Sequence, residues 1–201
     1  MDKNNKIALS IILLGLIISI IISINNINKY DVNKISDQGI EYHQMIKADV
    51  YRYLSHGNEI KIQLSEGVNF FKTGREHYTK YLPPRIMAAY YYITDTNLFS
   101  NLSKNKIQTG IHLPYLVFQS ILYYFAVIFL YFVISKRIDK KICLGIIAFL
   151  CFEPTILQYH SSFWSESIFF TIQILITSYV LKTKKTNFNF LIIGMLLATL
   201  S

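Results

Sequence analysis

The stretch IALSIILLGLIISIIISIN, residues 7–25, decides the fold. It holds no charged residue, and as a helix it rises about 28 Å, close to the roughly 30 Å hydrocarbon core of a bilayer. A signal peptide has a shorter apolar core that ends at a small-residue cleavage site, and no such site follows residue 25. We therefore expect an uncleaved signal anchor.

Composition extends this membrane assignment to the rest of the chain. The 201 residues are 52% hydrophobic and 15% aromatic, and the apolar residues come in blocks. These values are typical of an all-α integral membrane protein. The formal net charge of +8 would favour nucleic acid in a soluble protein. Here much of the basic charge flanks apolar blocks, where membrane topology places it, so we expect no nucleic-acid partner.

Further apolar segments occupy residues 113–135, 142–160 and 165–181, and a fifth span begins near Phe188. Basic residues gather before the first span, between the second and third, and after the fourth. If the spans alternate in direction, all three groups lie on one side, which the positive-inside rule makes the cytoplasm. The groups are Lys3 and Lys6; Lys136, Arg137, Lys140 and Lys141; and Lys182, Lys184 and Lys185. The N-terminus is then cytoplasmic.

These spans divide the chain into three regions. Residues 1–25 form the cytoplasmic N-terminus and signal anchor, residues 26–111 form a large extracytoplasmic loop, and residues 112–201 form closely spaced transmembrane helices. The last of these, residues 188–201, rises only about 21 Å, too little to cross a bilayer. We therefore expect the N-terminal part of a longer protein, or a truncated reading frame.

The loop is expected to carry two helices that lie in the membrane interface. The first covers residues 37–57, from a cap at Ser36 or Asp37 to Gly57, with apolar and polar residues on opposite faces. The apolar face holds Tyr42, Ile46, Val50, Tyr53 and Leu54, and the polar face holds Glu41, Gln44, Lys47, Asp49 and Arg52. The second begins at Pro83-Pro84, because proline favours a first helical turn, and continues through the aromatic-rich residues 85–93.

Asp37 is the first candidate for chemistry. It lies about twelve residues beyond the first span and opens the expected loop helix. The helix dipole favours the ionised form of a carboxylate at a helix N-terminus, which suits a general base at a membrane surface. From the residues alone, Asp37 is either such a base or a simple N-terminal cap.

Lys80 and Arg85 flank the rigid Pro83-Pro84 pair. Two cations held at the lipid boundary can bind the phosphate of a lipid-linked substrate. They can equally anchor the loop to anionic lipid headgroups. The sequence leaves both interpretations open.

Three polar residues at or near the later spans are candidates for lining a cavity: Glu153, His160 and Glu166. Glu153 lies inside the third span, where a carboxylate usually faces a cavity or a partner, and Pro154 beside it is expected to kink the helix. Glu166 falls in the first turn of the fourth span, where a favourable charge at a helix start explains it equally well.

The arrangement resembles the N-terminal part of the GT-C glycosyltransferases, in particular the branch of protein O-mannosyltransferases, aminoarabinose transferases and rhizobial core glycosyltransferases. The stretch SDQGIEYHQMIKADVYRYLSHG, residues 36–57, is similar to that family's D-E-x-x-Y-x-x-x-A pattern, although Gln38 replaces the second acid. The later stretch YLPPRIMAAYYYI, residues 81–93, resembles its Pro-Pro segment, and Pro154, Ser165 and Glu166 match the polar patch that opens the next span.

This resemblance implies a membrane enzyme that transfers a sugar from a polyprenyl-phosphate donor, with inversion, at the extracytoplasmic face. Asp37 would then be the general base. The donor phosphate would be bound near Lys80, Arg85, Glu41 and Tyr42. The acceptor would be a lipid, a glycan or a protein, and the surroundings membrane lipids, in a bacterial inner or plasma membrane.

The resemblance assigns no cofactor and leaves a divalent cation open. The histidines show no metal-ligand spacing, so no metal site is predicted; they are His43, His56, His77, His112 and His160. Two other functions stay open: a non-catalytic or truncated membrane protein, and a lipid-linked oligosaccharide polymerase or transporter.

Overall fold

The computed structural model describes residues 3–29, 48–69, 72–73, 82–95, 113–161 and 165–182. Within these ranges the regular structure consists of seven α-helices and no strand, which confirms the all-α prediction. The chain divides into two compact units. We call Met1–Ile24 with Leu116–Ser201 the membrane unit, and Asn25–Tyr115 the loop unit.

Two helices of the described chain are long and apolar enough to cross a membrane by themselves: α1 (Lys3–Lys29) and α4 (Leu113–Ile134). A third crossing is formed if α5 (Lys140–Phe152) and α6 (Pro154–His160), which are bent by 52° at their junction, count as one span. Two to three such helices indicate an integral membrane protein. The first two predicted spans are therefore confirmed as helices of spanning length, whereas the third predicted span is a bent pair of helices that passes the same test only when the two are counted together.

The bend lies at Glu153-Pro154, where the sequence predicts a kink. Proline has no N–H to donate and disfavours helical backbone in the residue before it. Glu153 accordingly adopts extended backbone, with φ −62° and ψ 123°. Its carboxylate accepts a hydrogen bond from the backbone N–H of Ile156 at 2.7 Å, so the side chain caps the start of α6. At the other end of α5, Asp139 caps the helix by accepting from the backbone N–H of Lys141 at 2.8 Å.

Helix α7 (Ser165–Lys182) covers the predicted fourth span. It is helical as expected, but it is not among the helices that are apolar enough to count as a span. Glu166, Gln173, Lys182 and several hydroxyl residues dilute its apolar character. The predicted fifth span, from Phe188 onward, lies outside the described residues.

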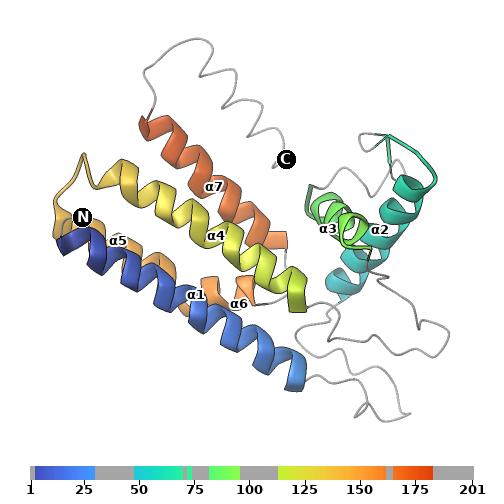
Figure 1. Ribbon diagram of the computed structural model, residues 1–201, viewed down its shortest axis with the longest axis horizontal. Coiled ribbons are helices and arrows are strands. Elements are labelled where there is room, and N and C mark those ends of the chain that lie inside the picture. Colours follow the sequence, from blue (N-terminus) through green and yellow to red (C-terminus); the bar gives the residue numbers. More distant parts are fainter. Residues whose placement is uncertain are drawn as a thin grey trace. The chain divides into compact units, whose positions relative to one another are not determined.

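Helices α1, α4, α5 and α7 of the membrane unit run alongside one another (Figure 1). At Gly15 helix α1 approaches α4 and α5 closely, since a Cβ atom there would lie 2.8 Å from Cε1 of Tyr124 and 2.9 Å from Cβ of Cys151. Tyrosine hydroxyls join the same helices, since Tyr123 donates to the carbonyl of Leu150 at 2.8 Å. Small residues allow such close helix contacts in a membrane, where packing and polar bonds replace the hydrophobic effect.

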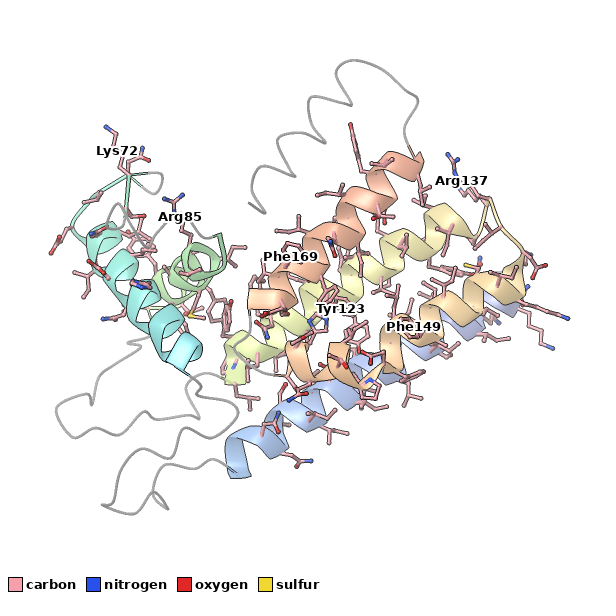
Figure 2. The ribbon with its side chains drawn as sticks, turned by 180° about the vertical axis from the view of Figure 1, so that it is seen from behind. Lys72, Arg85, Tyr123, Arg137, Phe149 and Phe169 are labelled. Carbon is pink, nitrogen blue, oxygen red and sulfur yellow. The ribbon has the colours of Figure 1, made fainter. Side chains whose placement is uncertain are left out.

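Large apolar side chains are exposed on the outside of the membrane unit. They are Leu13, Leu14, Ile17 and Ile21 on α1, Ile121, Phe125 and Phe132 on α4, and Ile142, Ile146 and Phe149 on α5. Figure 2 shows Phe149 on α5 and Phe169 on α7. A soluble surface rarely carries so much contiguous apolar area, whereas lipid tails solvate it well.

The loop unit contains two packed helices, α2 (Ala48–Ser65) and α3 (Leu82–Ile93). Helix α3 begins at Leu82 with Pro83-Pro84 in its first turn and ends at Ile93, as the sequence predicts. A Cβ atom at Gly57 would lie 3.3 Å from Sδ of Met87, so the glycine of α2 allows α3 to approach closely.

The prediction that the first loop helix ends at Gly57 is wrong. Helix α2 continues to Ser65, and its end is set by Gly67, whose φ of 82° lies in the left-handed region that glycine adopts freely. The backbone N–H of Val68 donates to the carbonyl of Gln63 at 2.9 Å, and that of Gly67 donates to Leu64 at 3.1 Å. These two bonds form a Schellman motif. The predicted start, residues 37–47, lies outside the described residues.

Candidate functional site

The described chain contains four of the eight predicted site residues. Arg85 belongs to the loop unit, and Glu153, His160 and Glu166 belong to the membrane unit. The other four, Asp37, Glu41, Tyr42 and Lys80, lie outside the described residues, so their roles stay predictions.

Arg85 lies in the first turn of α3 and is half-buried. Its Nη2 atom donates to the carbonyl of Thr73 at 3.5 Å, which is long for a hydrogen bond. Its Nε atom is buried and has no hydrogen-bond partner in the described part of the chain. A guanidinium offers five N–H donors, and a buried charge is costly unless it is paired. Arg85 therefore retains unused capacity to bind an anion.

Lys72 is a second cation of the loop unit, and it precedes Thr73, the residue whose carbonyl Arg85 contacts. Its backbone N–H donates to the carbonyl of Asn69 at 2.7 Å, and its side chain is exposed. The next residue, Thr73, is 2% exposed and supplies the carbonyl that Arg85 contacts. In Figure 2 the side chains of Lys72 and Arg85 both extend away from α2 and α3 on one side of the loop unit.

His160 is the centre of a buried polar cluster in the membrane unit. Its side chain is 0% exposed and lies in the last turn of α6. The Nδ1 atom is 2.7 Å from Oγ of Ser167 on α7, and the imidazole ring packs on the ring of Tyr123, with centroids 3.7 Å apart. The Nε2 atom is buried and has no partner within the described residues.

The backbone carbonyl of His160 is also bonded. Helix α6 leaves this carbonyl without an intrahelical partner, as at every helix end, and α4 supplies two donors. Nε2 of Gln119 donates at 2.9 Å and Oγ of Ser120 at 3.3 Å. Oγ of Ser120 is in turn 3.0 Å from Oγ of Ser19 on α1. The cluster thus joins α1, α4, α6 and α7 through polar groups that lie away from water.

Glu153 and Glu166, the other two residues predicted to line a cavity, lie at helix starts. Glu153 caps α6 through the Ile156 N–H, and Glu166 lies in the first turn of α7. In the described chain neither bonds to His160, whose partners are Ser167, Gln119 and Ser120. The described residues hold no group of three or more metal-ligating side chains. The cluster therefore joins helices through hydrogen bonds, and Nε2 of His160 has no partner among the described residues.

Sequence reasoning missed Lys72, Gln119, Ser120 and Ser167. The two serines and the glutamine lie on helices that were predicted from their apolar residues. A polar residue within such a helix indicates a buried polar contact and could have identified them. Lys72 carries no such signal, because its relation to Arg85 depends on a contact through Thr73.

Three tyrosines form an aromatic cluster at the end of α3. Tyr91 stacks on Tyr115 with ring centroids 5.7 Å apart, and Tyr90 meets Tyr115 edge-on at 5.4 Å. Burial raises the pKa of the Tyr91 phenol well above its usual range, and the neighbouring Tyr115 and Tyr90 add to this shift. Burial also raises the pKa of Tyr90. These phenols stay neutral at physiological pH and serve as packing groups.

Comparison of the chain with protein-family models, with curated proteins and with solved structures finds no match. The resemblance to the GT-C glycosyltransferases stays a prediction.

Proposed function

We propose that the protein takes part in sugar transfer from a polyprenyl-phosphate donor to an acceptor at the extracytoplasmic face of a membrane. The observation that carries this proposal is Arg85. It is a half-buried cation with a buried, unbonded Nε atom, and no carboxylate pairs with it in the described chain. It belongs to a unit that the chain connects to an apolar helix at each end.

An arginine in this state suits a phosphate better than a neutral ligand. Guanidinium and phosphate form parallel, charge-assisted hydrogen bonds that are about twice as strong as neutral ones. A phosphate attached to a long isoprenyl chain also needs an apolar environment for its tail. The exposed apolar side chains of α1, α4 and α5 indicate that the protein lies in a membrane, which would provide this apolar environment.

The proposed reaction assigns one role to each group. Asp37 takes the proton of the acceptor hydroxyl as that oxygen attacks the anomeric carbon of the donor sugar. The bond from this carbon to the phosphate oxygen breaks, and configuration inverts. Arg85 stabilises the negative charge on the departing polyprenyl phosphate. No redox partner is required.

A panel of donors tests this proposal. Membranes that contain the protein are incubated with polyprenyl-phosphate sugars and, separately, with the matching nucleotide sugars. Transfer from the lipid-linked donors alone supports the proposal. Transfer from the nucleotide sugars alone, or from none of the donors, contradicts it. An Asp37→Asn variant, which removes the base, is assayed beside the wild type.

A transporter of lipid-linked sugars is the second candidate, and the 52° break between α5 and α6 favours it. Transporters commonly place a broken helix at the substrate site. The two functions differ in product: a transporter moves the donor intact across the bilayer, whereas the enzyme yields a new glycoside and free polyprenyl phosphate.

A further inference from the structure

We infer that Lys72 and Arg85 together form a binding site for one phosphate group. This inference rests on the proposed function, whose donor carries such a group, and it adds a residue that the sequence did not indicate. The shared chemistry is a phosphate monoester or diester, whether free or on a lipid.

Arg85 has unused hydrogen-bond donors. Its one described hydrogen bond, from Nη2 to the Thr73 carbonyl, is 3.5 Å long, and its Nε atom is buried without a partner. A partly desolvated cation is stabilised when an anion arrives, because opposite charges attract more strongly where water is excluded. An unfilled guanidinium of this kind is therefore poised for an anionic ligand.

The backbone of Lys72 is held in place by a hydrogen bond. Its residue is held by the Asn69 carbonyl on one side, at 2.7 Å, and its neighbour Thr73 is buried. The guanidinium of Arg85 contacts the carbonyl of Thr73, which directly follows Lys72 in the sequence. The ammonium group is exposed and extends on the same side as Arg85 (Figure 2).

The charges of Lys72 and Arg85 also favour an anionic ligand. No carboxylate is paired with Lys72 or Arg85 in the part of the chain that the structure describes, whereas His56 in the same unit has Glu59 at 3.9 Å. An anion that both side chains can reach is attracted by both positive charges. A planar guanidinium fork and a flexible ammonium complement each other at a phosphate, the first binding in a fixed geometry and the second as a mobile point charge.

The test uses the purified 201-residue chain in a maltoside detergent, which carries no phosphate. Binding is measured for inorganic phosphate and for farnesyl phosphate, and in a third arm for vesicles of phosphatidylcholine with and without phosphatidic acid. The ligand that binds with the highest affinity identifies the source of the phosphate. We expect Lys72→Gln and Arg85→Gln each to weaken the tightest binding about tenfold or more, as loss of a charge-assisted hydrogen bond predicts.

Arg137→Gln is the matched control, because Arg137 is exposed and lies between α4 and α5 in the membrane unit. It removes the same charge and should leave binding unchanged. Arg85→Lys keeps the charge but loses the fork, and should bind more weakly than wild type. If Lys72→Gln and Arg85→Gln act on one ligand, the double variant weakens binding by a factor that differs from the product of the single effects.

Three results would overturn the inference: no binding in any arm, unchanged binding in Lys72→Gln, or equal weakening by Arg137→Gln. Lys72→Gln alters an exposed side chain, so it keeps the test independent of any folding defect in Arg85→Gln. Sugar transfer does not enter the measurement. In the separate transfer assay, a protein that binds phosphate but transfers no sugar would contradict the proposed function alone. A protein that transfers sugar, but whose phosphate binding is unchanged by Lys72→Gln, would contradict this site alone.

Discussion

Gly15 of α1 has no room for a side chain. An added Cβ atom would lie under 3 Å from atoms of both Tyr124 and Cys151. Real Cβ atoms do not approach so closely, so either a ring or a helix must shift. Gly145 on α5 offers the opposite case, since nothing lies within 4 Å of its Cβ position.

We therefore predict that Gly15→Ala destabilises the protein by about 1–3 kcal/mol, the usual range for overpacking. Gly145→Ala should be neutral or slightly stabilising, because alanine favours a helix by up to about 1 kcal/mol. Thermal unfolding of both variants in the same detergent checks the pair. Equal effects of the two substitutions would mean that α1 does not pack closely on α4 and α5.

Ser167 gives a second prediction at this scale. Replacement by alanine removes the group 2.7 Å from Nδ1 of His160 and leaves that buried nitrogen without a partner. The expected loss is about 1–3 kcal/mol, the desolvation penalty of an unsatisfied buried polar group. Ser178→Ala is the control, because that hydroxyl donates only to the Ile174 carbonyl of its own helix. Comparable losses for both would contradict a special role of the His160 cluster.

At the scale of elements, local signals predicted the helices better than they predicted where the helices end. The apolar runs predicted α1 and α4. Pro154 predicted the bend between α5 and α6, and Pro83-Pro84 predicted the start of α3. The prediction at Gly57 failed because glycine can either end a helix or allow another helix to pack closely. At Gly57 it allows close packing, and this packing depends on Met87, thirty residues further along the chain. The packing of α3 against α2 cannot be predicted from the sequence of either helix alone.

The cap at the α5–α6 junction predicts the outcome of two substitutions. Glu153→Ala removes the carboxylate that accepts from the Ile156 N–H and should cost about 1 kcal/mol, as loss of an N-terminal cap does. Glu153→Gln keeps an accepting oxygen and should recover part of that loss. Unfolding of both variants tests this order, and a glutamine variant less stable than the alanine variant would contradict it.

The tyrosine cluster of α3 predicts a pH dependence. Because the folded pKa of Tyr91 is raised above its unfolded value near 10, its contribution to stability is full below about pH 10 and is lost as pH rises further. Relative to Tyr91→Phe, the wild type should lose about 1 kcal/mol of unfolding free energy between about pH 10 and 11. Tyrosinate absorbance of the folded proteins should be the same in both at that pH. An extra ionised phenol in the folded wild type would contradict the burial of Tyr91.

At the scale of the whole molecule, sequence alone predicted a helical membrane protein with a large segment between its first two spans. It could not bring Thr73 to Arg85 or Ser167 to His160, because these contacts join residues through tertiary packing rather than through helical spacing. The candidate site was therefore predicted only in part. Positions for Asp37, Glu41, Tyr42 and Lys80 lie outside the described residues.

The distribution of basic residues predicts that the loop unit faces away from the cytoplasm. Cysteines introduced singly at two exposed positions test this orientation, Glu66→Cys in the loop unit and Arg137→Cys after α4. A membrane-impermeant maleimide added to intact cells should label the first and not the second. The native Cys143 and Cys151 are buried and provide a low background. The reverse labelling pattern would contradict the predicted orientation.

Sugar transfer by cells whose own copy of the protein carries Asp37→Asn tests the central claim most directly. Asp95→Asn is the matched control: Asp95 is exposed in the loop unit, and its φ of 49° is one that asparagine tolerates. Loss of a general base predicts a fall of about 10²- to 10⁴-fold in transfer from a polyprenyl-phosphate donor, with the protein still present in the membrane and the control unchanged. Transfer at the wild-type rate in Asp37→Asn would contradict the account.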